Sequence, residues 1–218
     1  MRILVACEES QRVCTAFRER GHEAFSCDII ECSGGHPEWH IKGDVLPLLN
    51  GNCEFTLQNG QTDRQTDRWD LIIAHPPCTY LTVSGNAWFD IEKYGDRARQ
   101  RYKDRYKAIV FFMQMVLANA DKVCVENPIG IMSTAYKKPT QIIQPFQFGH
   151  PYTKQTCLWL KGLDKLKPTE ILKKPESGWV NQSFTTDGRY GGFKAFNGSE
   201  QRSKTFPGIA KAMAEQWG

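Results

Sequence analysis

The sequence predicts an α/β fold with a mostly parallel central sheet flanked by helices. Four apolar runs of strand length carry this prediction, because each stops abruptly at polar or proline residues. Residues 2–7 and 23–27 enclose a helical pattern and form a βαβ unit, whose strands are parallel. Residues 69–74 end at His75-Pro76-Pro77-Cys78, and residues 122–126 end at Glu126-Asn127-Pro128. The carboxyl ends of such strands are where open α/β sheets bind ligands.

The first helix is expected to begin at Ser10, a capping residue, and to end at Gly21. Its apolar face comprises Val13, Ala16 and Phe17. The second strand closes at Asp28. A carboxylate there can accept hydrogen bonds from the hydroxyls of a ribose, or it can be an ordinary solvated residue.

Residues 40–49 predict a short third strand, with Gly43-Asp44 near its end. The polar stretch 51–68 is a surface insertion, since it contains Asn59-Gly60 and repeats Gln-Thr-Asp-Arg. Residues 79–96 form a connection long enough to be a mobile catalytic lid next to Cys78.

A helix is predicted from about residue 96 to residue 119. Its inner face is expected to comprise Tyr102, Tyr106, Ile109, Val110, Met113, Val116 and Leu117. Its first half is crowded with cations: Arg97, Arg99, Arg101, Lys103, Arg105 and Lys107. This basic run is either a solvated face or a surface that contacts phosphates.

The remaining chain predicts a strand at residues 156–160 and a closing helix at residues 207–217, with Pro207 in its permissive first turn. The 218 residues suffice for one domain, 1–218, with a sizeable core. No segment is apolar for long enough to cross a bilayer, and residues 1–5 resemble a strand more than a secretory signal. We therefore expect a cytoplasmic protein of bacterial or phage-infected cells.

The net charge restricts the possible partners only a little, and the cysteine content indicates the redox state. The formal charge of +4 is compatible with a nucleic-acid or nucleotide partner without requiring one. The eight cysteines form no regular framework, which indicates reduced thiols. Cys14, Cys124 and Cys157 are interpreted as small core residues.

The thiol of Cys78 and the carboxyl of Glu126 would face each other if their strands are neighbours. Such a pair can add a nucleophile to a heteroaromatic ring and protonate that ring. A thiolate suits this step because it is both a soft nucleophile and a good leaving group. The alternative is that Cys78 is a core thiol after a turn.

In order along the chain, the acidic turn after the first strand, Asp28, Gly43-Asp44-Val45, Pro76-Pro77-Cys78 and Glu126-Asn127 resemble the motifs of DNA cytosine-5 methyltransferases. The resemblance covers most of the first 130 residues and is closest to short, phage-encoded members that lack a target-recognition domain. It implies a Rossmann-like S-adenosylmethionine-dependent methyltransferase fold and methylation of cytosine C5 in DNA.

Carried over by position, the resemblance makes Cys78 the nucleophile at ring carbon 6 and Glu126 the partner of ring nitrogen 3, while Asn127 holds the loop. It implies that S-adenosylmethionine is bordered by Cys7, Glu8, Glu9, Asp28, Asp44 and Pro76. The substrate is expected to lie against Pro77, Thr79, Ser84, Arg97, Arg101 and Lys154.

The chain also departs from that family. Cys7-Glu8-Glu9-Ser10 has no glycine where the backbone normally approaches the cofactor. The chain is too short for a separate domain that reads DNA sequence. The substrate is then DNA bound by the basic helix, or a free or single-stranded cytosine nucleotide, which needs no extrusion from a stack. A third alternative is a non-catalytic methyltransferase fold that binds nucleic acid or a host protein.

Residues 27–40 offer one competing interpretation. Cys27, Cys32, His36 and His40 could be written as a zinc set, but their spacing is loose and the segment is a glycine-rich turn. We expect no metal. Residues 34–40 are more simply a loop over the cofactor or substrate, or a turn in which Trp39 packs.

Overall fold

The structure is a computed structural model that describes residues 1–174 and 203–218. Its centre is a seven-stranded sheet in the order β3-β2-β1-β6-β7-β9-β8. Neighbouring strands from β3 to β7 are parallel, whereas β9 runs antiparallel to both of its neighbours. The strands are β1 Arg2–Ala6, β2 Glu23–Asp28, β3 His40–Lys42, β6 Trp69–Ala74, β7 Ala120–Pro128, β8 Gln141–Ile143 and β9 Thr156–Lys161.

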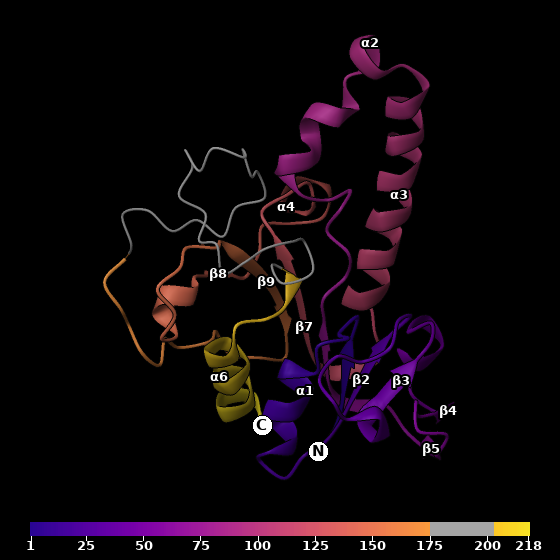
Figure 1. The fold of residues 1–218 in the computed structure, drawn as a ribbon, viewed down its shortest axis with the longest axis vertical. Helices are drawn as coiled ribbons and strands as arrows, with labels where there is room; N and C mark the ends of the chain where they lie inside the picture. Colours follow the sequence, from indigo (N-terminus) through magenta and orange to yellow (C-terminus); the bar gives the residue numbers. More distant parts are fainter. Residues whose placement is uncertain (175–202) are drawn as a thin grey trace.

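Helices cover both faces of this sheet (Figure 1). Helices α1 and α6 pack on one face, and α3 packs on the other. The α-helices are α1 Arg12–Arg18, α2 Ile91–Tyr94, α3 Asp96–Val116, α4 Met132–Ala135 and α6 Pro207–Trp217. Short 3-10 helices are η1 Pro37–Trp39, η2 Leu46–Leu48, η3 Val83–Phe89 and η4 Pro145–Gln147.

The central strands divide their side chains between the two layers. Ile3 and Val5 of β1 point to the layer of α1 and α6, whereas Leu4 and Ala6 point to the layer of α3; all four are fully buried. Alternation is the rule in strands because successive side chains leave opposite faces. Both faces are apolar because both are covered, as the continuous apolar runs of the sequence predicted.

From the centre of the sheet, the chain order runs β1-β2-β3 to one side and β6-β7 to the other. The strand order of the parallel part therefore reverses between β1 and β6. In chain order the first five strands of the sheet follow the doubly wound pattern, and the crevice at such a reversal is the usual ligand site of open α/β sheets. The mostly parallel, helix-flanked sheet predicted from the sequence is confirmed. Its first five strands have a doubly wound, Rossmann-like order.

Two predicted elements differ in extent. The third strand was expected to reach residue 49, but β3 stops at Lys42, and the chain then turns through η2 around Pro47, which lacks the N–H that a strand needs. The insertion 51–68 is an antiparallel hairpin of β4 Cys53–Thr56 and β5 Thr62–Gln65. The closing helix α6 has its predicted bounds.

The predicted inner face of α3 is correct only in part. Ile109, Met113 and Val116 are partly buried against the core, as expected. The fully buried side chains are Ala98, Phe112 and Met115. Tyr102, Tyr106, Val110 and Leu117 are exposed instead. The inner side of the first half is occupied by Arg101 and Arg105, whose guanidinium groups find acceptors and an aromatic ring there, as described below.

In the described part of the chain, no helix combines the length and the apolar character needed to cross a membrane.

Candidate active site

The carboxyl ends of β1, β6 and β7 meet at the strand-order reversal. The backbone N–H of His75, just after β6, donates to the carbonyl of Ala6 at 2.9 Å. The side-chain amide of Asn127 in β7 donates to the carbonyl of Pro76 at 2.7 Å and is almost fully buried. Asn127 therefore ties the end of β7 to the loop that carries Cys78, which is the role expected for it.

His75 and Glu126 form a buried pair beside Cys78. Nδ1 of His75 donates to Oε2 of Glu126 at 3.0 Å, and both side chains are nearly inaccessible. Burial alone would lower the pKa of His75, but the bond to Glu126 and the charges of Glu126 and Glu8 outweigh it and raise this pKa. Burial alone would raise the pKa of Glu126, but the bond from His75 and the charge of Lys154 outweigh it and lower this pKa. The contact therefore favours the charged form of each partner.

The thiol of Cys78 lies in the same electrostatic neighbourhood. Burial raises its pKa, the negative charge of Glu126 raises it further, and the positive charge of Lys154 offsets part of this rise. Near neutral pH the resting site therefore holds a protonated thiol and an ionised carboxyl group. A base must accept the thiol proton before the sulfur can add to a ring.

The loop that carries Cys78 is fixed to the loop that follows Glu126. The carbonyl of Cys78 accepts bonds from the N–H groups of Leu81 and Thr82, at 2.9 and 3.0 Å. Thr82 forms a β-bridge with Gly130, and the N–H of Ile131 donates to the carbonyl of Leu81 at 2.8 Å. A Cβ on Gly130 would come within 2.0 Å of that carbonyl oxygen, so the close approach requires glycine.

Helix α1 begins differently from the prediction. Ser10 does not cap it. The residue directly before the helix is Gln11, and its side chain makes no capping hydrogen bond. The buried carboxylate of Glu8 accepts from the backbone N–H groups of Val13 and Cys14, at 2.7 and 3.1 Å. Burial raises the pKa of Glu8, although the charge of His75 and these two N–H bonds oppose the rise. The carboxylate of Glu8 therefore satisfies two N–H groups in the first turn of α1.

Three further predicted residues gather at the ends of β1 to β3. Burial, then the charges of Asp28 and Asp44, raise the pKa of the Cys7 thiol to about 12, so the three lie within electrostatic reach of one another. The side chain of Asp28 is partly exposed, and that of Asp44 is exposed. Ile29 directly follows Asp28 and is 75% exposed. The carboxylates of Asp28 and Asp44 and the exposed side chain of Ile29 thus line the carboxyl edge of the sheet at β2 and β3.

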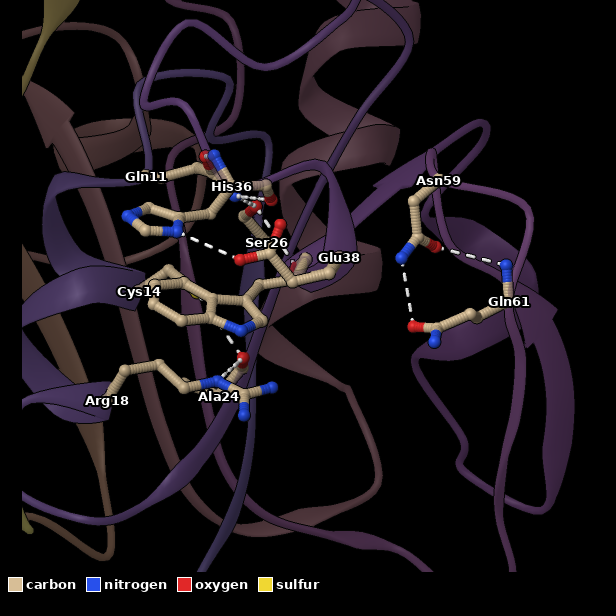
Figure 2. Close-up of polar contacts among 10 residues, drawn as sticks. Gln11, Cys14, Arg18, Ala24, Ser26, His36, Glu38, Asn59 and Gln61 are labelled. Carbon is tan, nitrogen blue, oxygen red and sulfur yellow. Dashed lines mark hydrogen bonds and ion pairs between the residues drawn. The ribbon is translucent and has the colours of Figure 1, made fainter.

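The loop between β2 and β3 folds back over the turn after β1. Gln11 is fully buried and binds the backbone of His36 twice, with Nε2 donating to the carbonyl at 2.8 Å and Oε1 accepting from the N–H at 3.0 Å (Figure 2). The carboxylate of Glu9 accepts a bond from the hydroxyl of Ser33 and lies 3.4 Å from the ammonium of Lys204. Glu9 therefore fastens this loop as well as standing beside the expected cofactor site.

The histidines of this loop take partners other than a metal. Nδ1 of His36 bonds Glu38 at 2.9 Å, and its ring stacks on Trp39 with centroids 3.8 Å apart. The ring of His40 bonds the hydroxyl of Ser26 and the carbonyl of Ile30, each at 2.9 Å. Within residues 1–174 and 203–218, no three potential ligands gather at one point.

The predicted lid, 79–96, folds as η3 and α2 and packs against α3. Nη2 of Arg101 donates to the carbonyl of Thr79 at 3.0 Å, and Nε of Arg105 donates to the carbonyl of Tyr80 at 2.9 Å. The guanidinium of Arg105 lies 3.4 Å from the ring centroid of Phe89. Arg101 thus braces the segment, while Pro77, Thr79, Ser84 and Arg97 are exposed. Whether the segment opens stays a prediction.

The residue types at this edge are compatible with the adenosine part of S-adenosylmethionine. Asp28 can accept from ribose hydroxyls, Asp44 from an adenine amine, and Ile29 offers an apolar surface to the ring. On the amino-acid side, Glu8 already occupies the terminus of α1. Two buried polar atoms near the reversal, Nε2 of His75 and Oδ1 of Asn127, have no partner in the described structure and can be satisfied by a bound molecule.

Sequence reasoning missed His75 and Gln11. His75 stands next to Pro76-Pro77-Cys78, and a titratable residue at the end of a buried strand was a usable signal. Gln11 gave none, since a glutamine in a helical first turn is ordinary.

Comparison with known proteins gives little. No protein-family model matches the sequence, and no curated protein matches it. One similar solved structure, from E. coli, is of a protein provisionally named a DNA modification methyltransferase encoded within a prophage. The two are 15% identical with a TM-score of 0.44, over 79% of this chain and 52% of the other. The chain thus spans about half the length of that protein.

Proposed function

We propose that the protein methylates carbon 5 of cytosine in DNA, using S-adenosylmethionine and a covalent adduct on Cys78. The observation that carries the proposal is the buried constellation of a protonated thiol, an ionised Glu126 and its partner His75 at the strand-order reversal. A core cysteine needs no such neighbours. Perturbed, coupled titratable groups in a ligand crevice are typical of a catalytic site.

One proton transfer can start the reaction. Glu126 accepts the proton of the Cys78 thiol and passes it to ring nitrogen 3 of cytosine, while the sulfur adds to ring carbon 6. The ring then carries electron density at carbon 5. S-adenosylmethionine, when bound, supplies an electrophilic methyl group for that carbon. Loss of the carbon 5 proton to a base then expels the thiolate and restores the aromatic ring. Nitrogen 3 returns its proton to Glu126, from which the thiolate recovers it, and the site is reset.

His75 and Lys154 set the charge of this site. Both lower the pKa of Glu126 and so keep this carboxyl group ionised near neutral pH. His75 also fixes the direction of the carboxylate through the 3.0 Å bond. We assign His75 as a positioning residue, because it acts on the substrate through Glu126.

The test is covalent trapping. The protein is incubated with S-adenosylmethionine and an oligonucleotide containing 5-fluorocytosine, whose fluorine cannot leave as a proton does. Mass spectrometry should locate the adduct on the peptide containing Cys78. Cys78→Ser should abolish the adduct and lower methyl transfer by at least about 10³-fold, since a hydroxyl is a poor nucleophile near neutral pH. Cofactor affinity should be nearly unchanged.

Cys53→Ser is the matched control, because Cys53 lies in the β4–β5 hairpin away from the strand-order reversal. It should keep both adduct and activity. An adduct on another cysteine, or full activity in Cys78→Ser, would reject the proposed nucleophile. Methylation of free cytosine nucleotide but not of DNA would keep the chemistry and change the substrate.

One observation favours a second candidate, a non-catalytic methyltransferase fold that binds nucleic acid. The carboxylate of Glu8 satisfies the amino terminus of α1, which leaves fewer free N–H groups for an anionic part of a cofactor. Calorimetry with S-adenosylmethionine decides between the two. Absence of binding would select the second candidate.

A further inference from the structure

Residues 83–107, here called the arm, stand out beyond the carboxyl edge of the sheet as η3, α2 and the first half of α3 (Figure 1). The arm begins five residues after Cys78. All the exposed large aromatic side chains of the described residues lie on it: Trp88, Tyr102 and Tyr106, with exposed fractions of 55%, 48% and 70%. An exposed aromatic cluster of this kind marks a binding surface.

The interior of the arm uses two of its cations. Arg101 and Arg105 face Phe89, and their guanidinium groups bond carbonyls 79 and 80. Nη2 of Arg105 also donates to the side chain of Asn86 at 2.7 Å. These two arginines therefore maintain the shape of the arm and are poor choices for the contact with a partner.

The outer face of the arm alternates cations with aromatic rings. Arg99, Lys103 and Lys107 follow one another at four-residue intervals, and Tyr102 and Tyr106 run beside them on the same side of α3. All five are exposed. Arg99 pairs with Asp96 at 2.8 Å, whereas Lys103 and Lys107 have no acidic partner among the described residues.

We propose that this outer face binds a single-stranded segment of DNA, with bases stacked on Tyr102 and Tyr106 and phosphates against Lys103 and Lys107. Cations with interleaved aromatic rings are how proteins hold single strands without reading sequence. The two rings start from positions about 5–6 Å apart, more than the ~3.4 Å repeat of stacked bases, which suits an extended strand. A duplex would present phosphates but no base faces to the rings.

This inference deepens the proposed function and rests on it only for the identity of the methylated base. It adds, on the segment that follows Cys78 in the chain, a surface that holds a strand whose bases are already unstacked. Binding is measured without methyl transfer, so the two proposals fail separately.

The experiment measures the affinity of the full chain for a fluorescein-labelled oligothymidylate by anisotropy, and for a duplex of the same length. Tyr106→Ala should weaken single-strand binding by about 5- to 150-fold, the effect of losing one stacked base. Tyr106→Phe keeps the ring and should restore binding. Tyr106 is preferred to Tyr102 because the ring of Tyr102 also packs edge-on against Phe89 at 4.9 Å.

The paired charge variant, Lys103→Gln with Lys107→Gln, should reduce the slope of log affinity against log salt by about 1.4, since each single-strand phosphate contact contributes ~0.7. The control pair is Lys138→Gln with Lys165→Gln, exposed cations outside the arm, which should leave the slope unchanged. Equal affinity for duplex and single strand with no effect of Tyr106→Ala would overturn the proposal. Absence of oligonucleotide binding at low salt would also overturn it and leave a protein as the partner of this face.

Discussion

The two halves of the sheet's carboxyl edge are built differently. At β6 and β7, His75 and Glu126 are buried and joined by a short bond, and their charges reach Cys78. At β1 to β3, Asp28 and Asp44 keep their carboxylates partly or largely in solvent. Under the proposed function, this difference means that the reacting groups are arranged before any ligand binds, whereas the side proposed for adenosine keeps hydrated carboxylates whose water a ligand must replace.

The largest expected effect that tests this comparison comes from Glu126→Gln, which keeps the shape and removes the proton acceptor. Methyl transfer should fall by about 10²–10⁴-fold, the usual contribution of a general acid or base. Alkylation of Cys78 by iodoacetamide should become faster, because the charge of Glu126 raises the pKa of that thiol. Rates of both reactions are measured on the same preparation.

These opposite responses separate a chemical role from misfolding. A misfolded variant would also lose methyl transfer, but its buried cysteines would all be alkylated faster, and not Cys78 alone. Glu23→Gln, at the amino end of β2, is the control and should change neither rate. Slower alkylation of Cys78 in Glu126→Gln would contradict the electrostatic coupling of the pair.

A smaller effect is expected on the other half. Asp28→Asn should weaken S-adenosylmethionine binding by about 1.5–3 kcal/mol, the scale of hydrogen bonds to a charged group, without changing alkylation of Cys78. Calorimetry measures the affinity. Asp67→Asn removes the same charge at the opposite edge of the sheet and should bind normally; equal affinity of the Asp28 variant would remove Asp28 from the cofactor site.

The smallest effect is a displacement of the pH dependence. In His75→Gln, Glu126 loses the cation that lowers its pKa, so its pKa rises. Activity that needs an ionised Glu126 is present above that pKa and is lost as the pH falls through it. The acid limb of the rate profile should therefore move to higher pH. His22→Gln, at the amino edge, should leave the limb in place, and an unmoved limb in His75→Gln would mean that His75 only fills space.

Most of the sheet could be predicted because buried parallel strands leave unmistakable apolar runs, such as residues 69–74. The inner face of α3 could not be predicted in full. The partly buried positions of Arg101 and Arg105 depend on carbonyls and an aromatic ring that the segment 79–90 contributes. Tyrosine is a reasonable core residue, and only the tertiary contacts of the arginines displace it.

The candidate site shows the same limit. Cys78 and Glu126 were expected to follow neighbouring strands, and β6 and β7 are paired in parallel. The roles of the two residues stay a prediction. The cap of α1 was missed, since a carboxylate five residues before the N–H group it accepts from lies outside the usual capping pattern. The pairing of Glu126 with His75 depends on the register between β7 and β6, which the sequence does not specify.

The close approach of Leu81 to Gly130 has a mechanical consequence. The backbone bonds across it join the segment that follows Cys78 to the segment that follows Glu126. The arm is tied to the same junction, because Arg101 and Arg105 donate to the carbonyls of Thr79 and Tyr80. A displacement at the base of the arm would therefore be transmitted to the loop that holds the thiol.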